Sequence, residues 1–303
     1  MGSSELIQHA LDPSHLAGGI TLGIEANWNQ TADDWRLFFE HGVGWGYSTQ
    51  SDQSTQFTQS NNASTTTARL VATTIVIPYD IKFAWVSVVL VAADFRRHGL
   101  ATRLMQRALQ YCAAIDRIPI LDATPAGREV YLRMGFTDAW WLERLIRPVT
   151  SAKKSDPVAV VAVRAIRKND WPGLLAYDRA VFGADRAPWL RALAKRWPAA
   201  AKIATARGAV VGYSLGRDGR LASQIGPVMA DTPFIAQALL CEVLRAVSGA
   251  VCIDLPKSQI GLRAWLMMQG FALGRPFSRM IRGANDTFDD HERLIASAGP
   301  EIG

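Results

Sequence analysis

The stretch VSVVLVAADFRRHGLATRL, residues 86–104, changes character twice along its length. It begins as an apolar run, passes through the basic turn Arg96-Arg97-His98, and reaches Gly99, where an amphipathic segment begins. Beyond this glycine, apolar residues recur four apart, which predicts a helix with one buried face. The apolar run is too short to span a membrane and predicts a buried strand. The stretch therefore predicts a strand–turn–helix unit with concentrated positive charge at its turn.

The turn has the features of an anion site. The first turn of a helix carries unpaired amide groups and about half a positive charge, and both attract phosphate groups. Gly99 lets the backbone approach a ligand because it has no Cβ atom. A pyrophosphate fits this arrangement, and a solvated basic loop is the alternative. The residues of the predicted site are Arg96, Arg97, His98, Gly99, Leu100, Ala101 and Thr102.

The composition predicts a globular protein with anionic partners. Of the 303 residues, 49% are hydrophobic and 20% charged, and the net charge is +6. Cys112, Cys241 and Cys252 are scattered, which predicts reduced thiols in a cytoplasmic protein. Neither cysteines nor histidines have metal-ligand spacing, so we expect no metal. No basic stripe is interleaved with aromatic residues, so we expect neither a nucleic-acid nor a membrane partner, and the sequence leaves a homodimer open.

Hydrophobic periodicity predicts helices and strands along both halves of the chain. We expect helices over 14–26, 32–40, 100–112, 125–134, 171–182, 190–196, 234–247 and 262–269. We expect strands over 69–78, 82–92, 117–123, 136–141, 158–166, 210–215, 222–229 and 251–255. Gly42, Gly44 and Gly46 predict loop and strand-edge positions. The polar tract 48–68 predicts a mobile hairpin loop.

The second half repeats the first. REVYLRMGF (128–136) aligns without gaps on RAWLMMQGF (263–271). ILDATP (120–125) resembles CIDLP (252–256), and SVVLVAAD (87–94) resembles QIGPVMAD (224–231). Three similarities in the same order indicate a duplication.

The repeat predicts two domains, 1–150 and 158–303, joined by a polar linker at Lys153–Pro157. The two copies differ where function is expected. The second copy has TPFIAQALL in place of FRRHGLATRL, and Leu266 in place of Tyr131.

These motifs resemble those of a known enzyme family. Arg96-x-x-Gly99-x-Ala101, after an apolar strand and at the start of a helix, resembles the acyl-CoA-binding motif of the GNAT N-acetyltransferase superfamily. VYLRMGF (130–136) after the DATPAG turn is similar to the next motif of that superfamily. The resemblance covers about residues 5–147, and residues 158–282 resemble a second, diverged domain. NWNQTADDW (27–35) and SRMIRG (278–283) are similar to a tandem bacterial subgroup.

The resemblance implies a fold class and a cofactor. The fold is α/β (α+β), with tandem GNAT-like folds, each a mixed, mostly antiparallel central sheet flanked by helices. Val89, Leu90 and Val91 are expected to pair with the pantetheine arm of acetyl-CoA, and an N–H of Leu90 or Val91 to polarise the thioester carbonyl. The second copy lacks the pyrophosphate loop, so only the first is expected to bind acetyl-CoA.

The resemblance also implies catalytic roles. Tyr131 matches the usual acid that protonates the departing thiolate, and a helix tyrosine in the core is the alternative. Asp122 is the leading candidate for a base, with Glu25 and Asp34 as weaker ones. Trp28, Asn29 and Gln30 are candidates for lining the acceptor site, and Trp28 alternatively anchors the core.

The sequence thus predicts an N-acetyltransferase that moves an acetyl group to a small-molecule amine or an amino-terminal acceptor by direct attack. The alternative is a CoA-binding or sensing module without turnover. Gly212–Gly216 matches the G-x-S-x-G pattern of hydrolases, but that pattern needs a helix directly after the serine. Here an RDG turn (217–219) and a predicted strand follow, so we expect a hairpin and no hydrolase.

Overall fold

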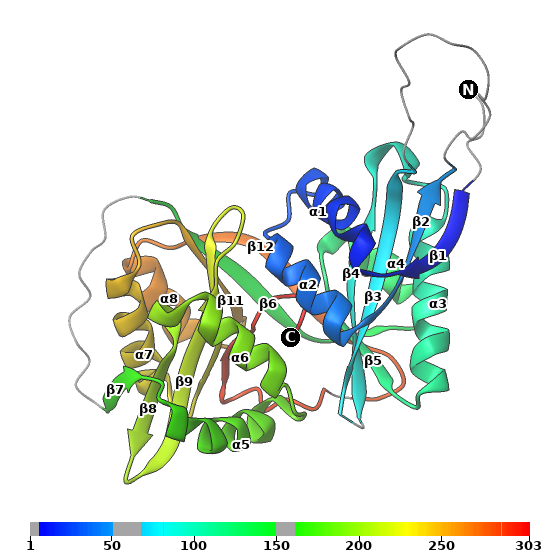
Figure 1. The fold of residues 1–303 in the computed structure, drawn as a ribbon. Helices are drawn as coiled ribbons and strands as arrows, with labels where there is room; N and C mark the ends of the chain where they lie inside the picture. Colours follow the sequence, from blue (N-terminus) through cyan, green and yellow to red (C-terminus); the bar gives the residue numbers. More distant parts are fainter. Residues whose placement is uncertain (1–5, 51–67, 81, 150–160, 286) are drawn as a thin grey trace. The chain divides into compact units, whose positions relative to one another are not determined.

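The computed structural model describes residues 6–50, 68–80, 82–149, 161–285 and 287–303 (Figure 1). The chain forms two compact units. The first comprises Met1–Ile77 and Val86–Ile115, and the second comprises Pro78–Trp85 and Asp116–Gly303. The predicted linker at 153–157 lies outside the described residues. The compact units do not follow the predicted division at 150–158, because residues 116–147 of the first half belong to the second unit.

The first unit has a sheet with helices on both faces. Its strands are β1 (Leu6–Leu11), β2 (Val43–Thr49), β3 (Leu70–Tyr79) up to Ile77, and the later part of β4 (Phe83–Val91), in that order across the sheet. Its helices are α1 (Leu16–Glu25), α2 (Ala32–His41) and α3 (Leu100–Ala114), with 3₁₀ turns at Pro13–His15 and Ala93–Phe95. Figure 1 shows α1 and α2 on one face and α3 on the other.

Local sequence explains most of these elements. The predicted apolar face of α3, with Leu100, Leu104, Ala108 and Cys112, is buried as expected. α2 begins with the capping box between Thr31 and Asp34, which satisfies two terminal amide groups.

The glycines of β2 correct one prediction. Gly44 and Gly46 lie inside β2, which pairs with strands on both sides, and not in a loop or at a sheet edge. A Cβ on Gly44 would lie 2.9 Å from Ile75, and one on Gly46 would lie 2.8 Å from Leu11. Close packing therefore requires glycine at both positions. The strand also extends to Thr49 at the start of the predicted polar loop, whose residues 51–67 lie outside the described residues.

The second unit has a longer mixed sheet. Its strand order is β4-β5-β12-β6-β11-β10-β9-β8-β7, where β4 contributes Phe83–Trp85, and β13 also pairs with β10. The further strands are β5 (Ile118–Ala123), β6 (Thr137–Arg147), β7 (Ala162–Ala165), β8 (Lys202–Ala206), β9 (Ala209–Arg217), β10 (Ser223–Ala230), β11 (Val251–Pro256), β12 (Ala272–Ile281) and β13 (Leu294–Ala296). The β4–β5 and β10–β11 pairs are parallel and the other described pairs of this unit are antiparallel. The predicted mixed, mostly antiparallel sheet is confirmed.

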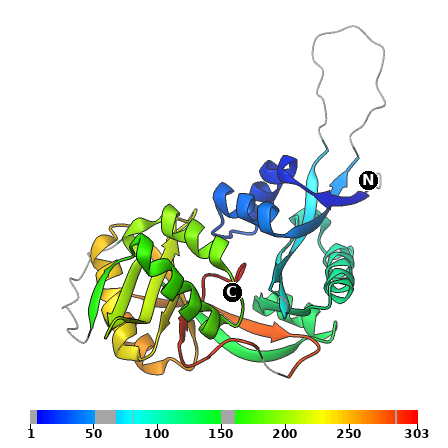
Figure 2. The same ribbon diagram turned by 60° about the horizontal axis from the view of Figure 1, so that its bottom comes forward.

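Helices cover this sheet as well. They are α4 (Pro125–Leu132), α5 (Trp171–Phe182), α6 (Ala187–Arg196), α7 (Pro233–Ala246) and α8 (Ile260–Met268), with 3₁₀ turns at Lys168–Asp170 and Pro198–Ala200. Figures 1 and 2 show α5 and α6 on one face of the β8–β11 region and α7 and α8 on the other. In the described parts of the chain, no helix is both long and apolar enough to cross a membrane.

The two repeats exchange their last strands within the second unit. β6 belongs to the first repeat but pairs with β11 of the second, and β12 of the second repeat pairs with β5 of the first. β6 and β12 also pair with each other along most of their lengths. Each repeat therefore completes its sheet with a strand from the other.

Two equivalent buried ion pairs fasten the exchanged strands. Arg144 on β6 donates to both carboxylate oxygens of Asp254 on β11, each at 2.7 Å. Arg279 on β12 donates to both oxygens of Asp122 on β5, at 2.8 and 2.9 Å. In each pair the two residues are direct cross-strand partners. We call these two contacts the reciprocal pairs.

The Arg279 pair is the more completely enclosed. The side chains of Arg279 and Asp122 are both 0% exposed. The Arg279 guanidinium lies between the rings of Trp85 and Trp140, at 4.6 and 4.3 Å from their centroids, and also binds Asp289 at 2.6 Å. Burial raises the pKa of Asp122, and the charge of Arg279 opposes that rise. Loss of Arg279 would therefore leave buried carboxylates without a cation.

We predict that Arg279→Met lowers the free energy of unfolding by about 3–5 kcal/mol, because removing one partner of a buried ion pair leaves the other uncompensated. The defect should be larger at neutral than at acidic pH. The unpaired Asp122 has a raised pKa in the folded state, so protonation below that pKa relieves the penalty and ionisation above it restores the penalty. Urea denaturation of the wild type and of Arg279→Met at several pH values measures the difference in free energy of unfolding.

Arg36→Met is the matched control. Arg36 pairs with Asp33 on the surface, and their side chains are 61% and 53% exposed. Such a pair contributes at most about 1 kcal/mol. A loss for Arg279→Met no greater than that of the control would show that the reciprocal pair does not hold the strand.

Candidate functional site

The turn between β4 and α3 has an open helix N-terminus. Gly99 precedes Leu100, the first residue of α3, and adopts a left-handed conformation with φ of 76°. No side chain of the cap residue closes the helix end, and a Cβ at Gly99 would meet no atom within 4 Å. Arg97 also has a positive φ, 65°, which is uncommon for a residue other than glycine. The amide groups at the start of α3 are therefore not covered by a capping side chain, and the left-handed conformation of Gly99 leaves space beside them.

The charge at this turn is positive and accessible. Arg96, Arg97, His98 and Thr102 are exposed, whereas Leu100 is buried beneath the turn. Within the described residues, neither Arg96 nor Arg97 forms an ion pair with a carboxylate. Arg96 instead donates from Nε to the carbonyl oxygen of Val91 at 3.1 Å, which ties the turn to the end of β4.

The nearest acidic residues are engaged by another cation. Asp94 accepts two hydrogen bonds from Arg69, at 2.6 and 3.1 Å, and this contact lowers the pKa of Asp94. Glu25 accepts a hydrogen bond from the backbone N–H of Ala93 and lies 3.7 Å from Arg69. Glu25, a weaker candidate for the base, therefore holds the turn in place, and the arginines that follow keep their net positive charge.

β4 has an unusual backbone conformation at Val88, immediately before the predicted cofactor-binding residues. Val88 has φ of 43°, an outlier for a β-branched residue, and it is buried. Its carbonyl oxygen accepts a hydrogen bond from the Thr73 hydroxyl at 2.8 Å, inside the unit. Strained backbone of this kind costs about 1–3 kcal/mol and is concentrated at functional sites. Val89, Leu90 and Val91 follow Val88 directly. Sequence analysis did not predict this conformation, because Val88 lies within an otherwise ordinary strand pattern.

Tyr131 lies on α4 in the second unit, whereas residues 96–102 lie in the first. Thr124 caps the start of α4, and its hydroxyl accepts the N–H of Gly127 at 3.2 Å. The Tyr131 ring is partly buried beside Phe136, with ring centroids 6.0 Å apart. Burial raises the pKa of Tyr131, so its hydroxyl keeps its proton throughout the neutral pH range. The side chain is thus protonated, as a general acid requires.

The prediction that Asp122 is the general base is not supported. Both of its oxygens accept hydrogen bonds from Arg279, and its side chain is fully enclosed. Its repeat counterpart Asp254 is bound in the same way by Arg144. A carboxylate held at this position in both copies is explained by strand exchange, and enclosure keeps the Asp122 side chain from solvent. We therefore assign Asp122 a structural role.

The acceptor-side candidates lie between α1 and α2. Asn29 and Gln30 are each 4% exposed, and Trp28 is partly buried, with its backbone N–H donating to Gly23 at 2.9 Å. Asp34 is buried in the α2 capping box. Asn29, Gln30 and Asp34 are thus folded into the first unit, and of this group Trp28 has the more accessible side chain.

The cysteines and the G-x-S-x-G match behave as expected. Cys112, Cys241 and Cys252 are buried free thiols, and burial raises the pKa of Cys112 to about 12 and that of Cys252 to about 11. Ser214 is buried within β9, which continues into β10 as a hairpin. In the described part of the chain, no three His, Cys, Asp or Glu side chains form a group that could hold a metal ion.

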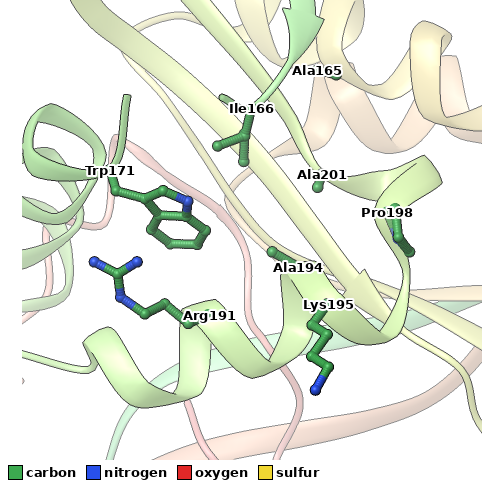
Figure 3. Close-up of a pocket in the computed structure, with 8 residues that line it drawn as sticks. All are labelled: Ala165, Ile166, Trp171, Arg191, Ala194, Lys195, Pro198 and Ala201. Carbon is green, nitrogen blue, oxygen red and sulfur yellow. The ribbon is translucent and has the colours of Figure 1, made fainter. Parts of the chain in front are cut away.

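A separate surface pocket lies in the second repeat and contains none of the predicted site residues. Its volume is about 380 Å³. Figure 3 shows Trp171 facing α6, where the Arg191 guanidinium lies 4.7 Å from the indole centroid and Lys195 follows one turn later. The other lining residues are Ala165, Ile166, Ala194, Pro198 and Ala201. Arg191 and Lys195 make the rim basic. The lining residues include no glycine, so the pocket differs from the turn before α3, where Gly99 precedes the helix.

Comparison with known proteins agrees with this architecture. Residues 28–136 match the model of the acetyltransferase (GNAT) family, and residues 174–296 match that of an acetyltransferase (GNAT) domain. The chain is 26% identical over 193 residues to the uncharacterised N-acetyltransferase YitH of Bacillus subtilis, covering 61% of this chain and 65% of YitH.

Solved structures share the fold at low identity. An acetyltransferase-like protein of Pyrococcus horikoshii superposes with a TM-score of 0.76 at 17% identity, covering 100% of this chain and 98% of the other. A GCN5-related N-acetyltransferase of Sphaerobacter thermophilus gives 0.66 at 14% identity, covering 96% and 100%. A tandem GNAT protein of the clavulanic acid biosynthesis pathway gives 0.59 at 13% identity, covering 93% and 100%.

The two family matches fall on the two sequence repeats and leave out the predicted linker between them. The chain belongs to the GNAT acetyltransferase superfamily, as a tandem protein with one GNAT domain in each repeat.

Proposed function

We propose that the protein is an acetyl-CoA-dependent N-acetyltransferase whose cofactor binds to the first repeat. The observation that carries the proposal is the turn before α3, where an uncapped helix N-terminus, the left-handed Gly99 and two arginines without carboxylate partners in the described residues come together. Helix amide groups and arginines in this arrangement bind a pyrophosphate well. A Cβ at Gly99 would meet no atom within 4 Å, so the backbone is open at this point of the turn.

The end of β4 fits the acyl end of the cofactor. Acetyl-CoA, when bound, supplies a thioester that an acceptor amine attacks directly, with release of the free thiol. The positive φ of Val88 lies just before Leu90 and Val91, whose N–H groups we assign to the carbonyl oxygen of the thioester. The Thr73 hydroxyl donates to the Val88 carbonyl oxygen and holds this backbone conformation.

Proton transfer requires an acid and a route for the amine proton. Tyr131 keeps its hydroxyl proton at neutral pH and donates it to the departing sulfur in this mechanism. The attacking amine loses one proton as the C–N bond forms, and the C–S bond breaks as the thiolate gains the Tyr131 proton. With Asp122 bound to Arg279, water is the most direct carrier of the amine proton. The acceptor is a small-molecule amine or an amino-terminal group.

We predict that the double variant Arg97→Met/Gly99→Ala weakens CoA binding at least about tenfold, a loss of about 1.4 kcal/mol. It removes one charge-assisted contact and places a side chain in a left-handed conformation at the binding turn. Titration calorimetry with CoA measures the effect.

Arg207→Met/Gly208→Ala is a matched control in the β8–β9 turn. Arg207 and Gly208 also have positive φ angles, 51° and 82°, and a Cβ at Gly208 meets no atom within 4 Å. The backbone cost of the two double variants is therefore similar, and the control should bind CoA like the wild type. Equal affinities for both variants would contradict the proposed site.

We predict that Tyr131→Phe lowers kcat by about 10²–10⁴, the usual contribution of a general acid, with CoA affinity unchanged. Steady-state assays over a panel of small amines and peptides with free amino termini measure this. Tyr177→Phe, which alters a helix tyrosine hydrogen-bonded to Asp231 in the second repeat, is the control.

Two outcomes would contradict the enzymatic proposal. An unchanged kcat in Tyr131→Phe would exclude Tyr131 as the acid. Tight CoA binding by the wild type without turnover of any amine in the panel would favour the CoA-sensing alternative.

A further inference from the structure

The segment Leu294–Gly303 is built into the sheet of the second repeat. β13 runs antiparallel to β10, and the N–H of Ala230 on β10 donates to the carbonyl of Arg293 at 3.0 Å. On the other side, the N–H of Ser297 donates to the carbonyl of Asp254 on β11, also at 3.0 Å. Figure 1 draws this segment in red. It is therefore hydrogen-bonded to both strands at once.

The segment lies against the part of β10 that corresponds, in the sequence repeat, to the proposed cofactor-binding part of β4. The alignment of residues 87–94 with 224–231 places Val89–Val91 opposite Gly226–Val228. β10 and β11 pair directly only from Ser223 to Ile225 on the β10 side, and beyond a bulge the segment pairs with Val228 and Met229. The backbone that corresponds to the proposed thioester-binding strand is thus already paired with the chain itself.

The segment leaves no room for a ligand there. The residues from Leu294 to Ser297 are each 0% exposed. A Cβ at Gly226 would lie 1.9 Å from the carbonyl oxygen of Ser297, so even a methyl group does not fit between them. Further along, Glu301 is 5% exposed and pairs with the buried Arg217 at 3.0 Å. Removing the segment would expose an apolar surface and leave Arg217 without this carboxylate.

The corresponding helix N-terminus is also closed. The hydroxyl of Thr232 accepts the N–H of Ile235 at 3.3 Å, and Pro233 at the start of α7 has no N–H to offer. Asp231, which aligns with Asp94 of the first repeat, precedes the cap and accepts a hydrogen bond from Tyr177 at 2.7 Å. The α3 turn has Gly99 and arginines in the same place. In the second repeat, the strand that would bind the pantetheine arm is therefore paired with residues 294–297, and the helix N-terminus that would bind the pyrophosphate is capped by Thr232.

We propose that residues 294–303 act as a permanent internal occupant of the second repeat's cofactor site, so that each chain binds a single CoA molecule, at the first repeat. The location of this site rests on the proposed function. The second repeat is then a closed framework that supplies β12 to the first, and the segment takes the place of the ligand in completing its sheet.

The experiment combines binding stoichiometry with hydrogen exchange on the full chain. Calorimetry with CoA is run on the wild type, on Arg96→Ala/Arg97→Ala/Gly99→Ala, and on the control Arg207→Ala/Gly208→Ala. Amide exchange of residues 294–303 is followed with and without saturating CoA. The N–H groups of Ser297, Ala298, Ile302 and Gly303 are all hydrogen-bonded, so they report directly on the segment.

We expect one CoA per chain for the wild type and the control, none for the triple variant, and exchange rates in the segment that change less than about twofold with CoA. A second equivalent of CoA, or exchange that rises tenfold or more when CoA is added, would overturn the inference. Binding retained by the triple variant with unchanged exchange would support the inference but contradict the proposed site. If the wild type binds no CoA, the proposed function fails, and exchange alone decides: slow exchange supports the internal occupant and fast exchange refutes it.

Discussion

Buried arginines on exchanged strands hold this fold together. Arg144 crosses to Asp254, and Arg279 crosses to Asp122, each pair directly opposite on neighbouring strands. A buried charge cannot leave its partner without a penalty of several kcal/mol, so these contacts fix both the register and the identity of the neighbouring strand. Neither repeat can complete its sheet alone, which explains why the compact units do not follow the sequence repeat.

The strand exchange does not involve the proposed cofactor site, so the two repeats can differ there. Strand exchange depends on β5, β6, β11 and β12, whereas the proposed cofactor site depends on β4 and α3. The turn before α3 keeps glycine and arginine, while the turn before α7 has a threonine cap and a proline. Because the framework contacts are separate from these turns, one copy can retain a ligand site while the other fills its site with polypeptide.

Sequence analysis predicted the helices and strands whose formation depends on nearby residues. The helical period identified α3 and its buried face, and Gly99 marked the helix start. It did not predict the exchange, because a strand's partner is set by distant residues. ERLI at 143–146 and SRMI at 278–281 align in the repeat, and with Asp122 and Asp254 they contained a signal for the reciprocal pairs. β13 has three residues and no measurable period, and nothing in the sequence marked the positive φ of Val88.

Because Asp122 has a structural role, the pKa of the acceptor amine becomes important for the proposed reaction. Asp122, Glu25 and Asp34 are each held by hydrogen bonds within the fold, so the proposed function assigns the amine proton to water and not to one of these carboxylates. An alkyl amine of pKa about 10 is neutral in only about one molecule in a thousand at pH 7, whereas an α-amino group of pKa about 8 is neutral in about one in ten. Without a strong base, only the neutral fraction of the amine can attack, so this hundredfold difference enters the rate and the weaker nucleophilicity of the less basic amine offsets part of it. On the proposed function, the site therefore favours amines of low pKa, and an amino-terminal or α-amino group meets that condition better than a lysine-like side chain.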